Sequence, residues 1–171
     1  MTTFYLVRHA DKDFDGEVLA GRTPGMPLSA TGRRQAEAIA RHLGDRSIRR
    51  VYSSPLARTR ETARPLARRC GLEVEVEEAF GEIDFGAWTN ESIRDLEPDE
   101  RWRRFHAFRS GVRIPGGERL LDVQARFAGA MLRLRRQWPE DDVAIFSHGD
   151  PIRLAVAYFA GVPIDLFDRL E

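Results

Sequence analysis

Short apolar runs alternate with amphipathic stretches along this chain of 171 residues. Residues 4–7 are rich in β-forming side chains and end at Arg8, and residues 51–53 form a second short run. Each run is followed by apolar residues at helical spacing. The first of these helices is expected to begin at Thr31 as its N-cap and to stop at Gly44. The pattern predicts two successive strand–helix units.

The second helix carries an apolar stripe that includes Cys70 and stops at Gly71. Pro65 lies inside this stripe and is expected to kink the helix or to begin a second piece. We interpret Cys70 as a buried thiol rather than a nucleophile, because it falls on the apolar face. In residues 72–77 valines alternate with glutamates, which predicts a strand with one wet face near a sheet edge.

The middle of the chain, residues 79–117, is less regular. It contains a charged helical stretch at residues 99–109, which is typical of a solvated face. It ends in a turn with two consecutive glycines. Residues 85–117 are a candidate cap over a site elsewhere in the molecule.

A long amphipathic helix, a strand and a final helix are expected after this segment. The long helix is predicted from apolar residues on one face, namely Leu120, Val123, Phe127, Met131 and Leu134. Residues 143–146 form an apolar run typical of a buried strand, and Asp150 is expected to cap the last helix, with Pro151 at its first position. No final strand follows, so a C-terminal strand is expected to be missing and one sheet edge to be uncovered.

Strands that alternate with amphipathic helices indicate an α/β fold with a largely parallel sheet. The length suits one compact domain over residues 1–171. Lys and Arg together number 27, as do Asp and Glu, so no bulk charge attracts nucleic acid or an anionic membrane. With no signal peptide, no apolar run long enough to span a bilayer and one cysteine, the chain is expected to be cytoplasmic.

Polar residues follow several predicted strands, where ligands bind in open parallel sheets. The first strand leads into Arg8 and His9, the second into a segment with Arg58, the third into Glu82, and the last into His148. A histidine at a strand end is by itself more often structural. The co-location of these groups after successive strands is what makes them a candidate site.

These residue types suit phosphoryl transfer. Arginine forks such as Arg8 and Arg58 can bind two oxygens of a phosphoryl group, and His148 can donate one further hydrogen bond. A neutral imidazole such as His9 can attack phosphorus directly. Glu82 is placed to protonate the leaving oxygen if burial raises its pKa, and afterwards to activate water.

Several sequence blocks occur in an order that resembles a known family. They are Arg-His-Ala after the first strand and the blocks at residues 21–29, 31–36, 53–63, 82–88, 115–118 and 147–153. Together these blocks resemble the histidine phosphatase superfamily, also called the phosphoglycerate mutase-like family, from residue 4 to about residue 160. Any one block alone would be weak evidence.

The resemblance implies a three-layer sandwich, in which a mostly parallel sheet has helices on both faces. It also implies that His9 is phosphorylated, that Arg8, Arg58 and His148 bind phosphate, and that Glu82 is the general acid. Gly149 and Thr23 are further candidates for the site. No metal and no cofactor are implied.

The loop after His9 departs from the family pattern. Ala10 replaces the commoner glycine, and the loop carries Asp11, Asp13 and Asp15 where many relatives have an asparagine that contacts phosphate. Carboxylates repel phosphate. The loop is therefore expected either to turn away or to meet a cationic part of the substrate.

The leading functional hypothesis is a phosphatase that hydrolyses a small phosphomonoester. The alternatives are a phosphomutase of the phosphoglycerate mutase type, a protein phosphohistidine phosphatase, and a catalytically silent phosphate-binding scaffold. The extended segment at residues 85–117 favours a small molecule over a protein substrate. The expected partner is a phosphorylated metabolite, with no nucleic acid and no membrane, and the oligomeric state stays open, a dimer included.

Overall fold

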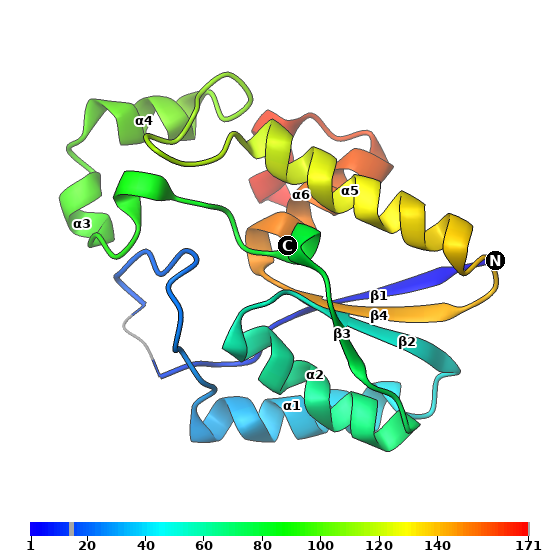
Figure 1. Ribbon diagram of the computed structural model, residues 1–171. Coiled ribbons are helices and arrows are strands. Elements are labelled where there is room, and N and C mark those ends of the chain that lie inside the picture. The colour runs from blue at the N-terminus through cyan, green and yellow to red at the C-terminus, as the bar shows by residue number, and fades with distance from the viewer. Residues whose placement is uncertain (14–15, 171) are drawn as a thin grey trace.

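The computed structural model describes residues 1–13 and 16–170 (Figure 1). Its longer elements are β1 (Thr3–Arg8), α1 (Ala30–Leu43), β2 (Ile48–Ser53), α2 (Ala57–Cys70), β3 (Val74–Val76), α5 (Leu120–Gln137), β4 (Asp142–Ser147) and α6 (Gly149–Ala160). The other elements are α3 (Ile93–Leu96), α4 (Glu100–Ala107) and the 3-10 helices η1 (Glu78–Phe80), η2 (Gly86–Trp88) and η3 (Ile164–Arg169). Within the described ranges, no helix is both long and apolar enough to cross a membrane.

The described strands form one sheet in the order β1-β4-β2-β3, and every neighbouring pair is parallel. Helices α1 and α2 cover one face, and α5 and α6 cover the other (Figure 1). The predicted α/β sandwich is therefore confirmed. The short strand β3 lies at a sheet edge, as the alternation of valine and glutamate in it predicts.

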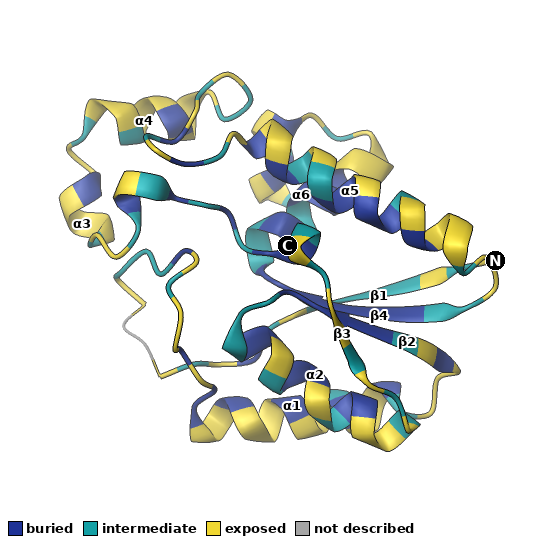
Figure 2. Cartoon of the chain, in the orientation of Figure 1, coloured by how far each residue is buried: buried dark blue, intermediate teal, exposed yellow. Residues whose placement is uncertain are grey.

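The central strand β4 shows how the sequence builds two cores. Side chains alternate across a strand, so Val143 and Ile145 pack with α5 and α6, whereas Ala144 and Phe146 pack with α1 and α2. All four are fully buried, and Figure 2 shows this strand dark over most of its length. Burial of each larger side chain stabilises the fold by about 1.5–3 kcal/mol.

Helix α1 begins one residue before the predicted N-cap. Ser29, not Thr31, is the N-cap, because its hydroxyl oxygen accepts a hydrogen bond of 2.9 Å from the backbone N–H of Gly32. Thr31 lies inside the first turn instead. The predicted end of this helix at Gly44 is confirmed.

Helix α2 runs through Pro65 without a break, so the prediction of a second helical piece was wrong. Buried Ala63 and Leu66 pack on both sides of the proline and hold the helix in place. Gly71 ends the helix with φ +66°, a left-handed conformation that favours glycine. Cys70 is only half-buried, because it lies at the margin of this core, which corrects the prediction of a buried thiol.

Helix α6 begins directly after β4, and Asp150 does not cap it. His148 is the N-cap residue, and its carbonyl oxygen accepts the first helical hydrogen bond from Ile152 N–H at 3.1 Å. Asp150 therefore lies in the first turn, and Pro151 follows it inside the helix. The helix starts at the edge of the sheet, so its first residues belong to that edge.

The segment that contains η2, α3 and α4 packs on the side of α5 and α6. Trp88 and Phe105 from this segment share a buried cluster with Leu154 of α6 and Phe167 of η3. The predicted charged helix at residues 99–109 is confirmed as α4, which has Asp99 as its N-cap. Figure 1 shows the segment beyond the carboxyl ends of the strands, and its role as a cap stays a prediction.

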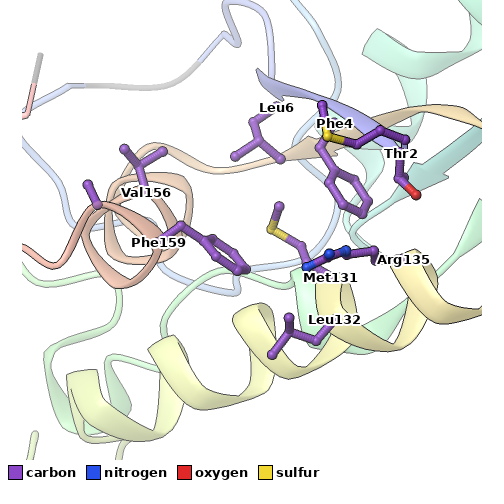
Figure 3. A pocket seen from close by; sticks show the side chains of 10 residues that line it. Thr2, Phe4, Leu6, Met131, Leu132, Arg135, Val156 and Phe159 are labelled. Carbon is purple, nitrogen blue, oxygen red and sulfur yellow. The ribbon is translucent and has the colours of Figure 1, made fainter. Parts of the chain in front are cut away.

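Strand β1 forms an edge of the described sheet, because residues 148–170 form α6 and η3 and no further strand. A cavity of about 590 Å³ opens beside it, between α5 and α6 (Figure 3). Its lining is mainly apolar and includes Phe4, Leu6, Met131 and Phe159. None of the predicted site residues lines this cavity, so the candidate site lies elsewhere.

Candidate active site

The parallel register brings three strand ends to one edge of the sheet. Arg8 pairs with Ser147 across β1 and β4, and Ser53 pairs with Phe146 across β2 and β4. The next backbone amides continue the pairing, because His9 N–H donates to Ser147 O and Ser54 N–H donates to Phe146 O, both at 2.9 Å. The residues that follow the three strands are therefore neighbours, as predicted.

The imidazole of His9 is held as one tautomer. Its Nδ1 lies 2.8 Å from the carbonyl oxygen of Ala10, and a carbonyl can only accept, so Nδ1 carries the proton. Burial lowers the pKa of His9 to about 4, helped by the charges of Arg58, Arg8 and Lys12 and opposed by the Ala10 hydrogen bond. The ring is thus neutral near pH 7, with an unprotonated Nε2.

His148 lies beside His9, with 5.3 Å between the ring centroids. The ring is fully buried, and its Nε2 lies 2.8 Å from the hydroxyl oxygen of Ser54. Burial and, next, the Arg58 charge lower the pKa of His148 well below its ordinary value, so this ring is also neutral. Its Nδ1 has no hydrogen-bond partner among the described residues.

Arg58 lies in the first turn of α2 and is 2% exposed. One terminal nitrogen donates to the carbonyl oxygen of Gly21 at 2.8 Å, while the buried Nε has no partner among the residues that the structure describes. Burial lowers the pKa of its guanidinium, and the Glu82 carboxyl opposes this. A buried cation with an unused donor is costly unless an anion completes its hydrogen bonds.

Arg8 and His9 line a cavity of about 360 Å³ together with Lys12. The side chain of Arg8 also extends past Gly149, where an added Cβ would lie 3.6 Å from the arginine Nε. The predicted residue Gly149 therefore lies at the site as the first residue of α6. Lys12 was not singled out from the sequence, although its position three residues after His9 is a signal.

Glu82 lies between η1 and η2, and its side chain is 16% exposed. One carboxyl oxygen accepts from the backbone N–H of Ile83 at 2.9 Å, and the other lies 3.6 Å from Nδ1 of His148. Burial and, next, the nearby Asp150 carboxylate raise the pKa of Glu82 to about 7, against the lowering effects of the Ile83 hydrogen bond, Arg58 and Arg126. Protonated and ionised forms of this carboxyl group thus coexist near neutral pH.

A network of charged side chains holds the backbone around Glu82. Arg126 on α5 donates to the carbonyl oxygens of Ala79, Gly81 and Glu82 at 2.6, 2.9 and 3.0 Å. Arg22 donates to the same Glu82 carbonyl at 2.8 Å.

Glu118 joins the two arginines of this network. Its carboxylate pairs with both Arg22 and Arg126 at 3.0 Å and also accepts from Asp84 N–H at 2.9 Å. Sequence reasoning missed the role of Arg126. A charged residue next to Phe127, at the border of the apolar face of α5, is the signal that could have found it.

The structure does not show a role at the site for every candidate. The Thr23 hydroxyl donates to Asn90 Oδ1 at 2.7 Å, so its proton is already used within the protein. Asp11 accepts from the Ser29 hydroxyl, which ties its carboxylate to the start of α1. Asp11 nevertheless lines the cavity of about 360 Å³ together with Arg8 and His9, so the loop does not turn away from the site at this residue. Asp13 is exposed, and Asp15 lies outside the described residues.

Ala10, the departure from the commoner glycine, has a structural explanation. Its methyl group is buried in a small cluster with Leu28 and Ala36. Its backbone N–H donates to the Thr62 hydroxyl at 3.0 Å, which links the loop after β1 to helix α2. The extra methyl group therefore fills space under the loop.

Over residues 1–13 and 16–170, no group of three or more His, Cys, Asp or Glu side chains could hold a metal ion. The site itself is made of the side chains described above. They comprise two neutral histidines, two arginines of which one is buried, and one carboxyl group that titrates near pH 7. Such a set suits an anionic substrate and proton transfer.

Comparison with known proteins gives relatives over most of the chain. A phosphoserine phosphatase 1 of Hydrogenobacter thermophilus is 32% identical, and the match covers 98% of this chain and 80% of the relative. A probable phosphoglycerate mutase of Photorhabdus laumondii is 30% identical, with coverage of 100% and 80%.

Solved structures agree with these relatives. A mycobacterial glucosyl-3-phosphoglycerate phosphatase superposes with a TM-score of 0.86 at 28% identity and covers 97% of this chain, which spans 82% of that structure. A phosphoserine phosphatase of Entamoeba histolytica in complex with 3-phosphoglyceric acid has a TM-score of 0.90 at 24% identity, with coverage of 100% and 86%, and shows the shared fold.

A family model provides the assignment. The model described as histidine phosphatase superfamily (branch 1) matches residues 4–171, which is nearly the whole chain. The resemblance inferred from the sequence blocks is thereby confirmed. The relatives include both phosphatases and phosphomutases. On this evidence the chain belongs to branch 1 of the histidine phosphatase superfamily.

Proposed function

We propose that this protein is a phosphatase that hydrolyses small phosphomonoesters through a phosphohistidine intermediate on His9. The observation that supports this most directly is that two buried nitrogens, Arg58 Nε and His148 Nδ1, have no hydrogen-bond partner among the described residues. The ring of His148 lies 5.3 Å from that of His9, whose Nε2 is unprotonated, and the charge of Arg58 acts on His9 as well. Unsatisfied buried donors are unfavourable, and a phosphoryl group supplies the missing acceptors. The nucleophile and the donors that stabilise its target thus meet at one place.

In the first step, Nε2 of His9 attacks phosphorus and the bond between phosphorus and the ester oxygen breaks. The departing ester oxygen takes the proton of Glu82 and leaves as the hydroxyl group of the alcohol product. A carboxyl group with a pKa near 7 is well matched to this task at neutral pH. Arg8, Arg58 and His148 bind the phosphoryl oxygens, where charge accumulates.

In the second step, the ionised Glu82 accepts a proton from a water molecule, and the water oxygen attacks phosphorus. The bond between phosphorus and Nε2 breaks, inorganic phosphate leaves, and His9 returns to its neutral form. Glu82 is then protonated again and ready for the next substrate. One carboxyl group therefore serves as acid in one step and as base in the next.

The test is phosphate release from a panel of phosphorylated metabolites by the wild type, by His9→Ala and by His42→Ala. His42 is exposed on α1 and serves as the matched control. We expect His9→Ala to lose activity by at least about 10⁴-fold, as for removal of a covalent nucleophile, and to give no phosphoenzyme that is stable in base and labile in acid. His42→Ala should behave as the wild type. Normal release by His9→Ala would overturn the proposal.

A phosphomutase is the second candidate, because one relative at 30% identity is a probable phosphoglycerate mutase. The two reactions share the first step and differ in what accepts the phosphoryl group. Turnover in water enriched in ¹⁸O separates them. A phosphatase places one ¹⁸O atom in each released phosphate, whereas a mutase returns an isomeric ester without labelled phosphate. Tight phosphate binding without either product would instead support a silent scaffold.

A further inference from the structure

A buried hydrogen bond joins Ser54 to His148 at the edge of the sheet. Ser54 is the first residue after β2 and His148 the first after β4, and these strands are neighbours (Figure 1). Both side chains are fully buried, and 2.8 Å separates the serine Oγ from the histidine Nε2. The family resemblance rests on blocks that contain both residues, but gives no role to this serine.

The direction of this hydrogen bond follows from the available partners. A neutral imidazole carries one proton, and a hydroxyl group can donate one and accept others. The Ser54 oxygen accepts a long hydrogen bond of 3.4 Å from Leu56 N–H. Within the described part of the chain, its proton has no acceptor other than Nε2 of His148. Ser54 must therefore donate to Nε2, because a buried hydroxyl without an acceptor is unfavourable.

The proton of the imidazole is then on Nδ1, the nitrogen without a partner in the described structure. This nitrogen lies 3.6 Å from a carboxyl oxygen of Glu82, which is too long for a good hydrogen bond. Its N–H is therefore free to bind an oxygen that enters beside His9. The opposite tautomer would present a lone pair there and repel such an oxygen.

We propose that Ser54 is a positioning residue that fixes His148 as a permanent Nδ1–H donor to a phosphoryl oxygen. The inference rests on the proposed function for the identity of the oxygen. The tautomer itself rests on the buried contacts of a neutral ring and not on the proposed function. Burial keeps the pKa of His148 low, so the ring stays neutral and the serine decides which nitrogen carries the proton.

Ser53 offers a matched control on the same strand end. It is equally buried, but its hydroxyl donates to the backbone carbonyl of Ser54 at 2.9 Å and does not contact His148. Ser53→Ala thus removes a buried hydroxyl with the same change in volume. Ser54→Thr keeps a hydroxyl at the decisive position and is the rescue variant for Ser54→Ala.

The experiment uses protein labelled with ¹⁵N in its four histidines, whose ring nitrogens report protonation directly by NMR. His148→Gln assigns the signals. We expect the wild type to have a proton on Nδ1 and none on Nε2, and inorganic phosphate to shift the Nδ1–H signal. Ser54→Ala should show a mixture of tautomers and bind phosphate about tenfold more weakly, while Ser53→Ala should match the wild type and Ser54→Thr should restore the single tautomer.

A wild-type proton on Nε2 would overturn the inference, as would an unchanged tautomer and affinity in Ser54→Ala. An Nδ1–H signal that does not respond to phosphate would also overturn it. These readouts need binding and no turnover. Failure of the proposed function would appear separately, as absence of phosphate release by a wild type that still binds phosphate.

Discussion

The two halves of the candidate site are built in different ways. His9 and His148 follow neighbouring strands, and sheet hydrogen bonds fix the backbone beside them. Glu82 lies outside helices and strands, and Arg22 and Arg126, which both pair with Glu118, donate to its carbonyl oxygen instead. The sheet therefore positions the two histidines, and ionic contacts position Glu82.

Burial shifts the pKa values of His9 and Glu82 in opposite directions, and in both cases it favours the uncharged form of the side chain. It lowers the pKa of His9 to about 4 and raises the pKa of Glu82 to about 7. Desolvation disfavours the charged form of any group, so the histidine loses its proton and the carboxyl group keeps one. The nucleophile and the acid are therefore both in their proposed reactive forms between about pH 4 and pH 7.

The largest expected effect in this comparison comes from Glu82→Gln. For an alkyl phosphate, whose leaving oxygen needs a proton, we expect kcat/KM to fall about 10²–10⁴-fold below pH 7. The wild type should lose activity above about pH 7, as Glu82 ionises, and the variant should lack this alkaline limb. With p-nitrophenyl phosphate the loss in kcat/KM should be much smaller, because that leaving group departs without a proton.

Measurement of kcat/KM against pH for both esters checks this. Equal losses for the two esters would show that Glu82 does not act as the acid, and an alkaline limb retained by the variant would assign that limb to another group. The acid limb near pH 4 should be the same in both proteins, because it belongs to His9. The alkaline limb of the pH profile thus reports on Glu82, and the acid limb reports on His9.

The half built on strand ends could be predicted from the sequence, and the other half only in part. Arg58 and His148 follow short apolar runs, and parallel register places such residues together. Glu82 was predicted with them, although no strand leads directly into it. The bonds of Arg126 depend on how α5 packs over η1, which a one-dimensional pattern does not encode.

Helix starts were predicted less well than the strands. Thr31 and Asp150 are both good N-cap residues by type, yet the helices begin before them at Ala30 and Gly149. At α1 the competing cap Ser29 wins because its hydroxyl reaches Gly32 N–H. At α6 the strand leads directly into the helix, so tertiary position overrides the local preference.

The buried environment of Glu82 should also lower the free energy of unfolding at a pH where its carboxyl group is ionised. The folded pKa of about 7 exceeds the ordinary value of 4.5, so the folded protein binds the proton more tightly than the unfolded chain. Stability therefore falls as pH rises from about 4.5 to 7. Because glutamine stays uncharged, Glu82→Gln should be more stable than the wild type at pH 8, by up to about 3 kcal/mol.

Urea unfolding of both proteins at pH 8 and at pH 4.5 checks this value. The difference in the free energy of unfolding should shrink to less than about 0.5 kcal/mol at the lower pH, where the carboxyl group is protonated in the folded state and about half protonated in the unfolded chain. Equal stabilities at pH 8 would mean that the Glu82 carboxylate is well solvated or paired in the folded protein. The raised pKa would then be wrong.

The smallest effect is expected from Arg126→Lys, which tests whether ionic contacts position Glu82. Lysine keeps the charge but cannot bridge three carbonyl oxygens and both oxygens of Glu118, as the guanidinium does. The backbone of residues 79–82 should be held less firmly, so the Glu82 carboxyl group should be less well positioned. We expect kcat to fall about tenfold while KM changes little. Both values are measured with the alkyl phosphate.

Arg133→Lys is the matched control for this variant, because Arg133 lies on the same helix and pairs with Glu77. Among the described contacts, Arg133 makes no hydrogen bond to the carbonyl oxygens of residues 79–82 that Arg126 holds, so the kcat of Arg133→Lys should stay at the wild-type value. Arg126→Lys should leave the acid limb near pH 4 in place, since His9 is positioned by the sheet. If the two lysine variants had the same kcat, the carboxyl group would be held by its own backbone, and the contrast between the two halves of the site would disappear.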